Sequence, residues 1–462
     1  MLFNSIAFIF VFLPIVYLVF WWLETKSSRY IWLAVTGYVF YGWWDFRFCW
    51  LMLFSTLVSY FAGVAILKRE TKEEKKIPMV LAITADLLLL GFFKYYNFFA
   101  SSINSISLMF GIKTLPYFHI ILPIGISFYT FHTMSYVIDS YRGTIKPTRN
   151  FFEFTCYVSL FSQLVAGPIV RFRQIEDDLE NIDRAGQFSK FEEGIFLFLI
   201  GLFKKVLIAD SIAAIINPGF DAISLMSSGG AWLLAFGYTF QLYFDFSGYS
   251  DMAMGLGFLF GIRIPQNFNS PYKALNITDF WRRWHISLSS WLRDYLYIPL
   301  GGNRLGSARR YENLMITMLL GGLWHGAQWT FVFWGAYHGV LLILHSWSQE
   351  NLPLKVPKVL SQAMTFIAVV VGWVFFRCES LAQAFNLLIL MVMPQSGLLP
   401  SKSGILILLI LVCAGVVWKF PNSSEMPLRR KGFANIAVTF LFALSIFRIL
   451  VNENSPFLYF QF

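Results

Sequence analysis

Long apolar runs alternate with short polar stretches along the chain. The first run, residues 2–23, has no Lys or Arg before it; it is longer than a usual signal-peptide core, and no cleavage site of small residues follows. Since crossing a bilayer takes about 20 apolar residues, we expect a retained transmembrane helix. The whole pattern predicts about eleven crossings, drawn from 2–23, 30–43, 46–67, 78–93, 117–138, 151–170, 191–216, 231–260, 314–323 with 329–345, 359–376, 405–418 and 433–451.

The composition supports the membrane interpretation. The 462 residues are 57% hydrophobic and 13% charged, about half the charge of a soluble domain. Several predicted crossings are short or broken by Gly and Pro, and such segments are expected to be re-entrant or half-helices. The four cysteines are scattered without a CxxC pair, so neither a disulfide framework nor a metal site is predicted.

The net charge of +10 lies in short loops between apolar runs rather than on one basic face. This distribution follows the positive-inside rule and argues against nucleic-acid binding. Lys26 and Arg29, the cluster at 68–76, and Arg429 to Lys431 all become cytoplasmic if the N-terminus lies outside. The pattern therefore predicts a multi-pass protein with both termini outside the cytoplasm.

One stretch lacks a convincing crossing and is rich in Trp and Arg. It reads TDFWRRWHISLSSWLRDYLYIPLGGNR, residues 278–304. Thr278 or Asp279 can cap a helix, and helical spacing then aligns Trp281, Trp284 and His285 on one side. A helix with aromatic and cationic sides suits the headgroup region, so we expect this segment to lie in the membrane plane.

Polar side chains inside apolar runs are costly and each suggests a function. His325 stands in GGLWHGAQW, where glycines permit close approach of backbone or substrate. Its imidazole could take a proton from a hydroxyl that attacks a thioester. His285 could share this work, with the two histidines acting as base and orienting acid. The alternative for each is a buried or interfacial histidine with a packing role.

Asp245 and Asp251 lie in a third apolar run, QLYFDFSGYSDMAMGLG. Unpaired carboxylates there would be expensive, so we expect partners within the bundle, with Arg263, Arg282 and Arg293 as candidates. An architectural role is favoured over catalysis for both. The chain has no phosphate-binding glycine loop after a strand and no GxSxG motif, which leaves histidine-based transfer as the leading chemistry.

In these motifs the sequence resembles the membrane-bound O-acyltransferase (MBOAT) family, and in particular its bacterial alginate O-acetyltransferase-like branch. The similar segments are LPIGISFYTFHTMSYVIDSYRG (122–143), LFSQLVAGPIVRF (160–172), residues 244–257, the 278–304 segment, GGLWHGAQWTFVFWG (321–335) and the ending SPFLYFQF (455–462). Their order and spacing cover nearly the whole chain.

The resemblance implies a single all-α domain over 1–462, with a ring of tilted helices around a central tunnel. Within it we expect N-terminal helices over 1–115, a catalytic core over 116–350 and C-terminal helices over 351–462. His325 takes the family's catalytic histidine position and His285 its second position. The expected substrate- or tunnel-lining residues are Trp281, Arg282, Trp284, Arg293, Asn303, Trp324, Gln328, Gln163, Asp245 and Ser247.

The expected function is transfer of an acetyl group from a cytoplasmic thioester, with acetyl-CoA as the donor and no bound cofactor, to an extracytoplasmic polysaccharide. The chain contains no SGNH-hydrolase domain, so a separate SGNH-type partner is expected, in a bacterial inner membrane. The alternatives are D-alanyl transfer from a carrier protein to a cell-wall polymer and, more remotely, a membrane transporter, although no inverted repeat is evident.

Three positions depart from the family pattern. His132 stands where Gln is expected, Ser162 where Pro is expected, and Gln328 where Asn is expected. All three lie away from the two key histidines. They therefore bear on which polysaccharide system the chain serves more than on the reaction.

Overall fold

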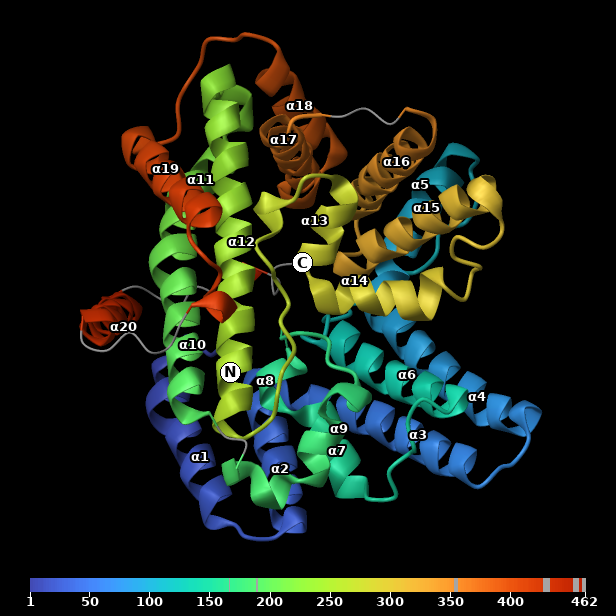
Figure 1. The fold of residues 1–462 in the computed structure, drawn as a ribbon. Helices are drawn as coiled ribbons and strands as arrows, with labels where there is room; N and C mark the ends of the chain where they lie inside the picture. The colour runs from blue at the N-terminus through green and yellow to red at the C-terminus, as the bar shows by residue number, and fades with distance from the viewer. Residues whose placement is uncertain (166, 188–189, 353–355, 427–432, 452–456, 459–462) are drawn as a thin grey trace. The chain divides into compact units, whose positions relative to one another are not determined.

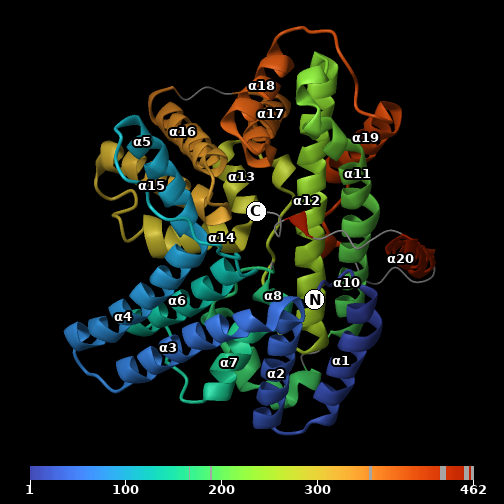
Figure 2. The ribbon, with the colours of Figure 1, turned by 180° about the vertical axis from the view of Figure 1, so that it is seen from behind.

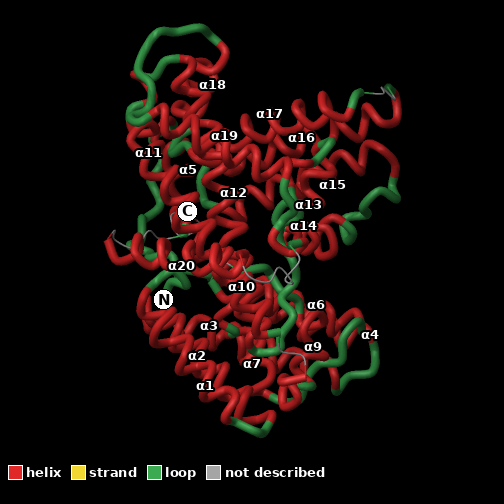
Figure 3. Tube along the Cα trace, turned by 60° about the vertical axis from the view of Figure 1, so that its left-hand side comes forward, coloured by secondary structure: helices red, strands yellow, loops and turns green. Residues whose placement is uncertain are grey.

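The computed structural model describes residues 1–165, 167–187, 190–352, 356–426, 433–451 and 457–458. Throughout these ranges the regular secondary structure is helical, with one isolated bridge between Met226 and Leu398 and no strand (Figure 3). The predicted all-α class is thereby confirmed. The basic cluster at 429–431 and most of the ending 455–462 lie outside the described residues.

The chain forms two compact units, one of residues 1–195 and 253–265 and the other of residues 196–252 and 266–462. The domain limits expected from the sequence, at 115 and 350, remain predictions. The first unit contains η1 (Phe8–Phe12), α1 (Leu13–Trp22), α2 (Lys26–Asp45), η2 (Phe46–Phe48), α3 (Cys49–Leu67), α4 (Lys72–Leu90), η3 (Gly91–Tyr95), α5 (Tyr96–Met109), α6 (Ile126–Arg142), α7 (Phe151–Ser159), α8 (Phe161–Leu164), α9 (Phe172–Glu180) and η4 (Ile182–Gln187).

In the first unit, α3, α4 and α6 lie side by side (Figures 1 and 2). The buried Asp86 carboxylate of α4 accepts hydrogen bonds from Ser55 of α3 at 2.6 Å and from Thr133 of α6 at 2.8 Å. A buried acceptor costs free energy unless it is hydrogen-bonded. These hydroxyls therefore fix the three helices together.

The second unit holds the later helices of the chain. It contains most of α10 (Phe191–Phe203) and of α12 (Ser228–Leu259), together with η5 (Lys204–Ala209), α11 (Asp210–Asp221), η6 (Ile223–Leu225), η7 (Pro271–Lys273), α13 (Ile277–Arg283), α14 (Ile286–Leu292), η8 (Arg293–Tyr297), α15 (Gly306–His325), α16 (Trp329–Asn351), α17 (Lys358–Arg377), α18 (Leu381–Val392), α19 (Ser403–Lys419), η9 (Ser423–Glu425) and α20 (Phe433–Val451).

Two glycines let α15 and α16 pack with their backbones in contact. A Cβ added at Gly322 would lie 2.2 Å from the Phe331 carbonyl oxygen, and one at Gly335 would lie 2.3 Å from the Met318 oxygen. Real Cβ atoms do not tolerate such distances, so only glycine fits at either position. This close approach brings the end of α15, with His325, against α16.

Three helical stretches in the described ranges are long and apolar enough to cross a membrane: 26–67, 72–109 and 358–377. Four shorter apolar helices lie at 8–22, 381–392, 403–419 and 438–451. These helices fit a multi-pass membrane protein, and the total of about eleven crossings remains a prediction. Three helices, α5, α9 and α18, were not predicted, and α6 begins at residue 126 rather than 117, because Gly125 adopts φ 77° and residues 112–123 form no helix.

Candidate active site

The segment expected to form one continuous helix is broken at its histidine. Helix α13 ends at Arg283, and α14 begins at Ile286. Between them, His285 has φ 43°, a left-handed conformation that is uncommon outside glycine. The prediction of an unbroken helix from 278 was therefore wrong. The expected cap was also wrong, because Asn276 caps α13 by accepting from the Asp279 N–H at 2.8 Å.

The break turns the His285 side chain into the interior of the second unit. The imidazole is completely buried, with its ring 4.7 Å from that of Phe246 and 5.9 Å from that of Trp324 (centroid distances). Its Nδ1 lies 3.2 Å from Asn267 Oδ1. Burial in this apolar surrounding lowers the pKa of the His285 imidazole and favours its neutral form.

His325 is the last residue of α15, and Gly326 follows it in an extended conformation. The side chain is 5% exposed, and its ring packs edge-on against Trp334 of α16 at 5.0 Å and Phe376 of α17 at 5.2 Å. The carbonyl end of a helix carries partial negative charge. The end of α15 therefore favours the imidazolium that forms when His325 accepts a proton.

The structure brings the two histidines together. Their ring centroids lie 6.3 Å apart, with 58° between the ring planes, although 40 residues separate them in the sequence. A general base must come within about 2.6–3.2 Å of the proton-bearing atom. At this ring separation, one hydroxyl group can lie within reach of both imidazoles.

His325 lines a cavity of about 480 Å³ in the second unit, and His285 does not line it. Four other residues expected at the site also line this cavity: Trp281, Arg282, Arg293 and Asn303. Among the arginines that line the cavity, Arg293 pairs with Asp294 at 2.7 Å, and Arg310 pairs with Glu350. Apolar walls with a few charged groups and an imidazole are typical of a site for a small ligand.

Other expected site residues occupy the surroundings of this cavity or lie elsewhere. Trp324 is buried beside both histidines, with ring distances of 5.9 and 5.1 Å. Trp284 packs on Trp373 at 4.8 Å, Ser247 is buried within α12, and Gln328 is exposed at the start of α16. Gln163 belongs to the first unit, where it donates to the Tyr157 carbonyl at 2.6 Å.

The buried carboxylates of α12 pair with lysines rather than with the arginines that we expected. Asp245 lies 2.6 Å from Lys205, and Asp251 lies 2.6 Å from Lys204. The reason is a close helix contact, because a Cβ on Gly201 would lie 2.4 Å from the Gly248 carbonyl oxygen. At so short a distance, the two lysines that follow α10 reach the carboxylates directly.

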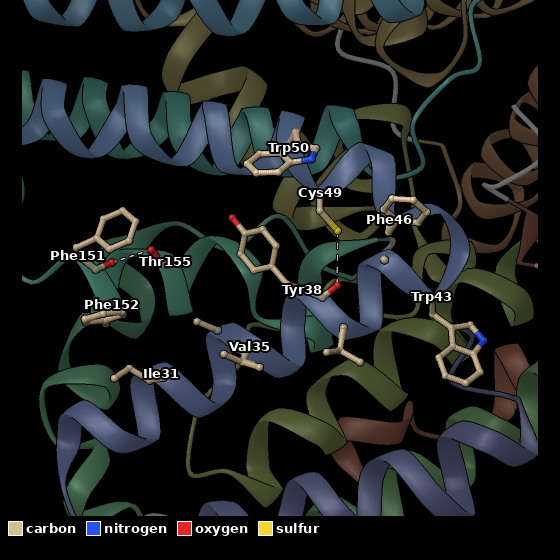
Figure 4. Close-up of a pocket in the computed structure, with 13 residues that line it drawn as sticks. Ile31, Val35, Tyr38, Trp43, Phe46, Cys49, Trp50, Phe151, Phe152 and Thr155 are labelled. Atoms are coloured by element: carbon tan, nitrogen blue, oxygen red, sulfur yellow. Dashed lines mark hydrogen bonds between the residues drawn. The ribbon is translucent and has the colours of Figure 1, made fainter.

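A second hollow, of about 720 Å³, lies on the first unit between α2, α3 and α7 (Figure 4). Trp43 and Phe46 lie at one end of it, and Ile31 and Phe152 lie at the other. Its walls contain no carboxylate, histidine, lysine or arginine. This apolar groove lacks the groups that acyl transfer needs, so the cavity beside His325 is the better candidate site.

Sequence reasoning missed two residues that contact expected site residues. Asn267 contacts His285, and Lys205 pairs with Asp245. The cost of a buried carboxylate showed that Asp245 needed a cation, but nothing in the local pattern identified which one. No sequence signal marked Asn267, because its contact with His285 depends on the left-handed turn.

Comparison with known proteins identifies the family. The MBOAT family model, described as the membrane-bound O-acyltransferase family, matches residues 145–385. The chain is 41% identical to the "probable alginate O-acetylase AlgI" of Azotobacter vinelandii over the full length of both proteins. It is 40% identical to the peptidoglycan O-acetyltransferase of Helicobacter pylori, with 84% of this chain and 79% of that protein aligned.

A more distant relative bears on the alternative function. The teichoic acid D-alanyltransferase of Streptococcus thermophilus is 30% identical, over 49% of this chain and 58% of its own length. The family match and the full-length similarity to AlgI together settle the class of this protein. The chain belongs to the membrane-bound O-acyltransferase family and is an O-acyltransferase of the membrane.

Proposed function

We propose that the chain carries an acetyl group from cytoplasmic acetyl-CoA across the membrane for O-acetylation of an extracytoplasmic polysaccharide, through a separate SGNH-type partner. The observation that carries this proposal is His325 at a cavity whose walls also hold arginines. The names of the two similar O-acetyl-transferring proteins favour acetyl and a polysaccharide. We place the chain in a bacterial inner membrane with both termini outside the cytoplasm, as its charge pattern predicts.

In the proposed reaction, His325 acts as general base. It takes the proton of a hydroxyl group while that oxygen attacks the thioester carbonyl carbon. A C–O ester bond forms, the C–S bond breaks, and the proton on the imidazole passes to the departing thiolate. The imidazolium exists only between these two transfers, at the helix end that favours it. No resident cofactor takes part.

The donor is tested with membranes that contain the wild-type chain and its candidate SGNH partner. We expect radiolabelled acetyl-CoA to transfer its label to the partner or the polysaccharide. The competing assay supplies labelled D-alanine on a carrier protein. Transfer from the D-alanyl carrier alone would replace our proposal by the D-alanyl alternative, and transfer from neither donor would refute both.

Arg282 offers a sharper test of where the donor binds. It lines the His325 cavity, and unlike Arg293 and Arg310 it has no ion pair with any residue that the structure describes. Acetyl-CoA is anionic, so Arg282→Ala should raise KM for acetyl-CoA about 10-fold or more with kcat nearly unchanged, since a hydrogen bond to a charged group contributes about 1.5 kcal/mol or more.

The control for this measurement is Arg309→Ala. Arg309 is an exposed arginine of α15 that pairs with Glu312 at 2.8 Å and does not line the cavity. It removes the same charge from the same unit. If both variants raised KM equally, the effect would come from overall charge, and the proposal that the donor binds in this cavity would be wrong.

A further inference from the structure

The buried side chain of Asn267, in the loop that follows α12, contacts the His285 imidazole and its neighbours through hydrogen bonds. Its Oδ1 lies 3.1 Å from the Ser287 backbone nitrogen, 2.9 Å from Ser287 Oγ and 3.2 Å from His285 Nδ1. Its Nδ2 donates to Ser250 Oγ of α12 at 3.4 Å. The Asn267 amide therefore contacts His285, Ser287 and helix α12.

These contacts determine which end of the amide is the oxygen. A backbone N–H can only donate, so the atom that faces the Ser287 nitrogen must be an acceptor. The amide nitrogen then points to Ser250, whose hydroxyl can accept from it. The hydrogen-bond pattern therefore fixes which end of the Asn267 side-chain amide is the oxygen.

The same reasoning determines the proton on His285. An amide oxygen cannot donate, so the Nδ1 that faces it must carry the hydrogen. A lone pair on Nδ1 would repel the lone pairs of Asn267 Oδ1. The Ser287 hydroxyl, 3.4 Å from Nδ1, already donates to the same oxygen. A neutral imidazole with its hydrogen on Nδ1 has its lone pair on Nε2.

Asn267 also holds the backbone that presents the histidine. Its own carbonyl accepts the Ile286 N–H at 2.9 Å, while its side chain accepts the next N–H, that of Ser287. These two bonds replace the helical partners that α13 would have supplied if it had continued. The left-handed conformation of His285 is thus maintained from outside its own helix, as is common for strained residues at functional sites.

We propose that Asn267 is a positioning residue that fixes His285 as the tautomer with hydrogen on Nδ1, so that the Nε2 of His285 bears the lone pair and accepts a hydrogen bond from the substrate whose hydroxyl reacts at His325. This inference rests on the proposed roles of the two histidines and divides the work between them. His325 removes the single proton of the reacting hydroxyl, and His285 orients the hydroxyl-bearing substrate by accepting a hydrogen bond from a second N–H or O–H of that substrate. Phe246, Phe268 and Trp324 surround the His285 ring, and His325 is its titratable neighbour.

Two variants test the proposal kinetically. Asn267→Ala removes the acceptor, and kcat should fall about 10- to 100-fold, the usual cost of losing a group that orients a histidine, with KM for acetyl-CoA unchanged. Asn267→Asp keeps an oxygen in place but adds a negative charge. That charge raises the pKa of His285, so activity should be lost on the acid side at a pH at least one unit higher than in the wild type.

Asn269→Asp is the matched control. Asn269 belongs to the same loop and contacts Asn422 rather than His285, with its Oδ1 3.1 Å from Asn422 Nδ2. The Asn269→Asp variant adds an equal charge two residues away, and the pH profile of its activity should match that of the wild type. A shift of the same size in both variants would assign the effect to general electrostatics and overturn the proposal.

A measurement on the wild-type chain does not depend on whether any variant folds. The chain has six histidines, and ¹⁵N spectra of the labelled protein in lipid distinguish a protonated Nδ1 from a protonated Nε2. Comparison with His285→Gln identifies the signal. A protonated Nε2 on neutral His285 would overturn the inference. Unchanged kinetics in both Asn267 variants would also overturn it and leave the proposed function standing, whereas full activity of His325→Ala would refute the proposed function itself.

Discussion

Replacing His325 by alanine is expected to reduce kcat for acetyl transfer by about 10²- to 10⁴-fold, the usual contribution of a positioned general base. His325 lines the cavity of about 480 Å³, lies at the carbonyl end of a helix, and has the second histidine at 6.3 Å between ring centroids. No other histidine lines that cavity. The residual rate would come from binding and orientation of the two substrates.

The measurement is transfer of labelled acetyl in membranes, at equal amounts of inserted protein. His119→Ala serves as the control, since His119 is an exposed histidine in the non-helical stretch 112–123. It should transfer acetyl at the wild-type rate. If His325→Ala were as active as His119→Ala, the proton would have to leave by another route, and our mechanism would be wrong.

Much of this site could be anticipated from the sequence because its signals are local and costly. A histidine between glycines and tryptophans within apolar sequence is expensive to bury, and this alone marked His325. The family motifs then marked His285. The class of fold followed from apolar runs of membrane-spanning length, which the helices at 26–67, 72–109 and 358–377 confirm.

What could not be anticipated depends on contacts between distant segments. The spacing of apolar residues predicted one helix through His285. The helix is broken there because the side-chain amide of Asn267, in another loop, accepts the Ser287 N–H at 3.1 Å. Helical periodicity carries no information about such a contact. The partner of Asp245 was sought among arginines, since the approach of Gly201 to Gly248 is a property of two packed helices. Both corrections are tertiary features, and both concern polar groups whose partners a linear pattern cannot specify.

Replacing Lys205 by methionine is expected to destabilise the protein by about 3–5 kcal/mol, the cost of leaving buried charge uncompensated. The Lys205 ammonium lies 2.6 Å from Asp245 and 2.7 Å from Asp210, and its side chain is 3% exposed. Without it, two carboxylates would face each other in a dry interior. Thermal unfolding in detergent, followed by loss of helical signal, measures the effect.

The arrangement predicts an asymmetry between the partners. Asp245→Asn leaves Lys205 paired with Asp210 and keeps an acceptor for the Leu458 N–H, which lies 3.0 Å from Asp245 Oδ2. It should therefore cost clearly less than Lys205→Met. Arg309→Met, which breaks an exposed pair with Glu312, should cost less than about 1 kcal/mol.

The double variant Lys205→Met with Asp245→Asn tests whether Lys205 and Asp245 stabilise each other or contribute independently to the free energy of unfolding. If the ammonium serves chiefly to compensate Asp245, removing both charges should cost less than the sum of the single losses, because no carboxylate at 245 remains to be neutralised. Strictly additive losses would mean that Lys205 and Asp245 do not stabilise each other. Asp210 would then be the partner that matters, and the burial of Asp245 would need another explanation.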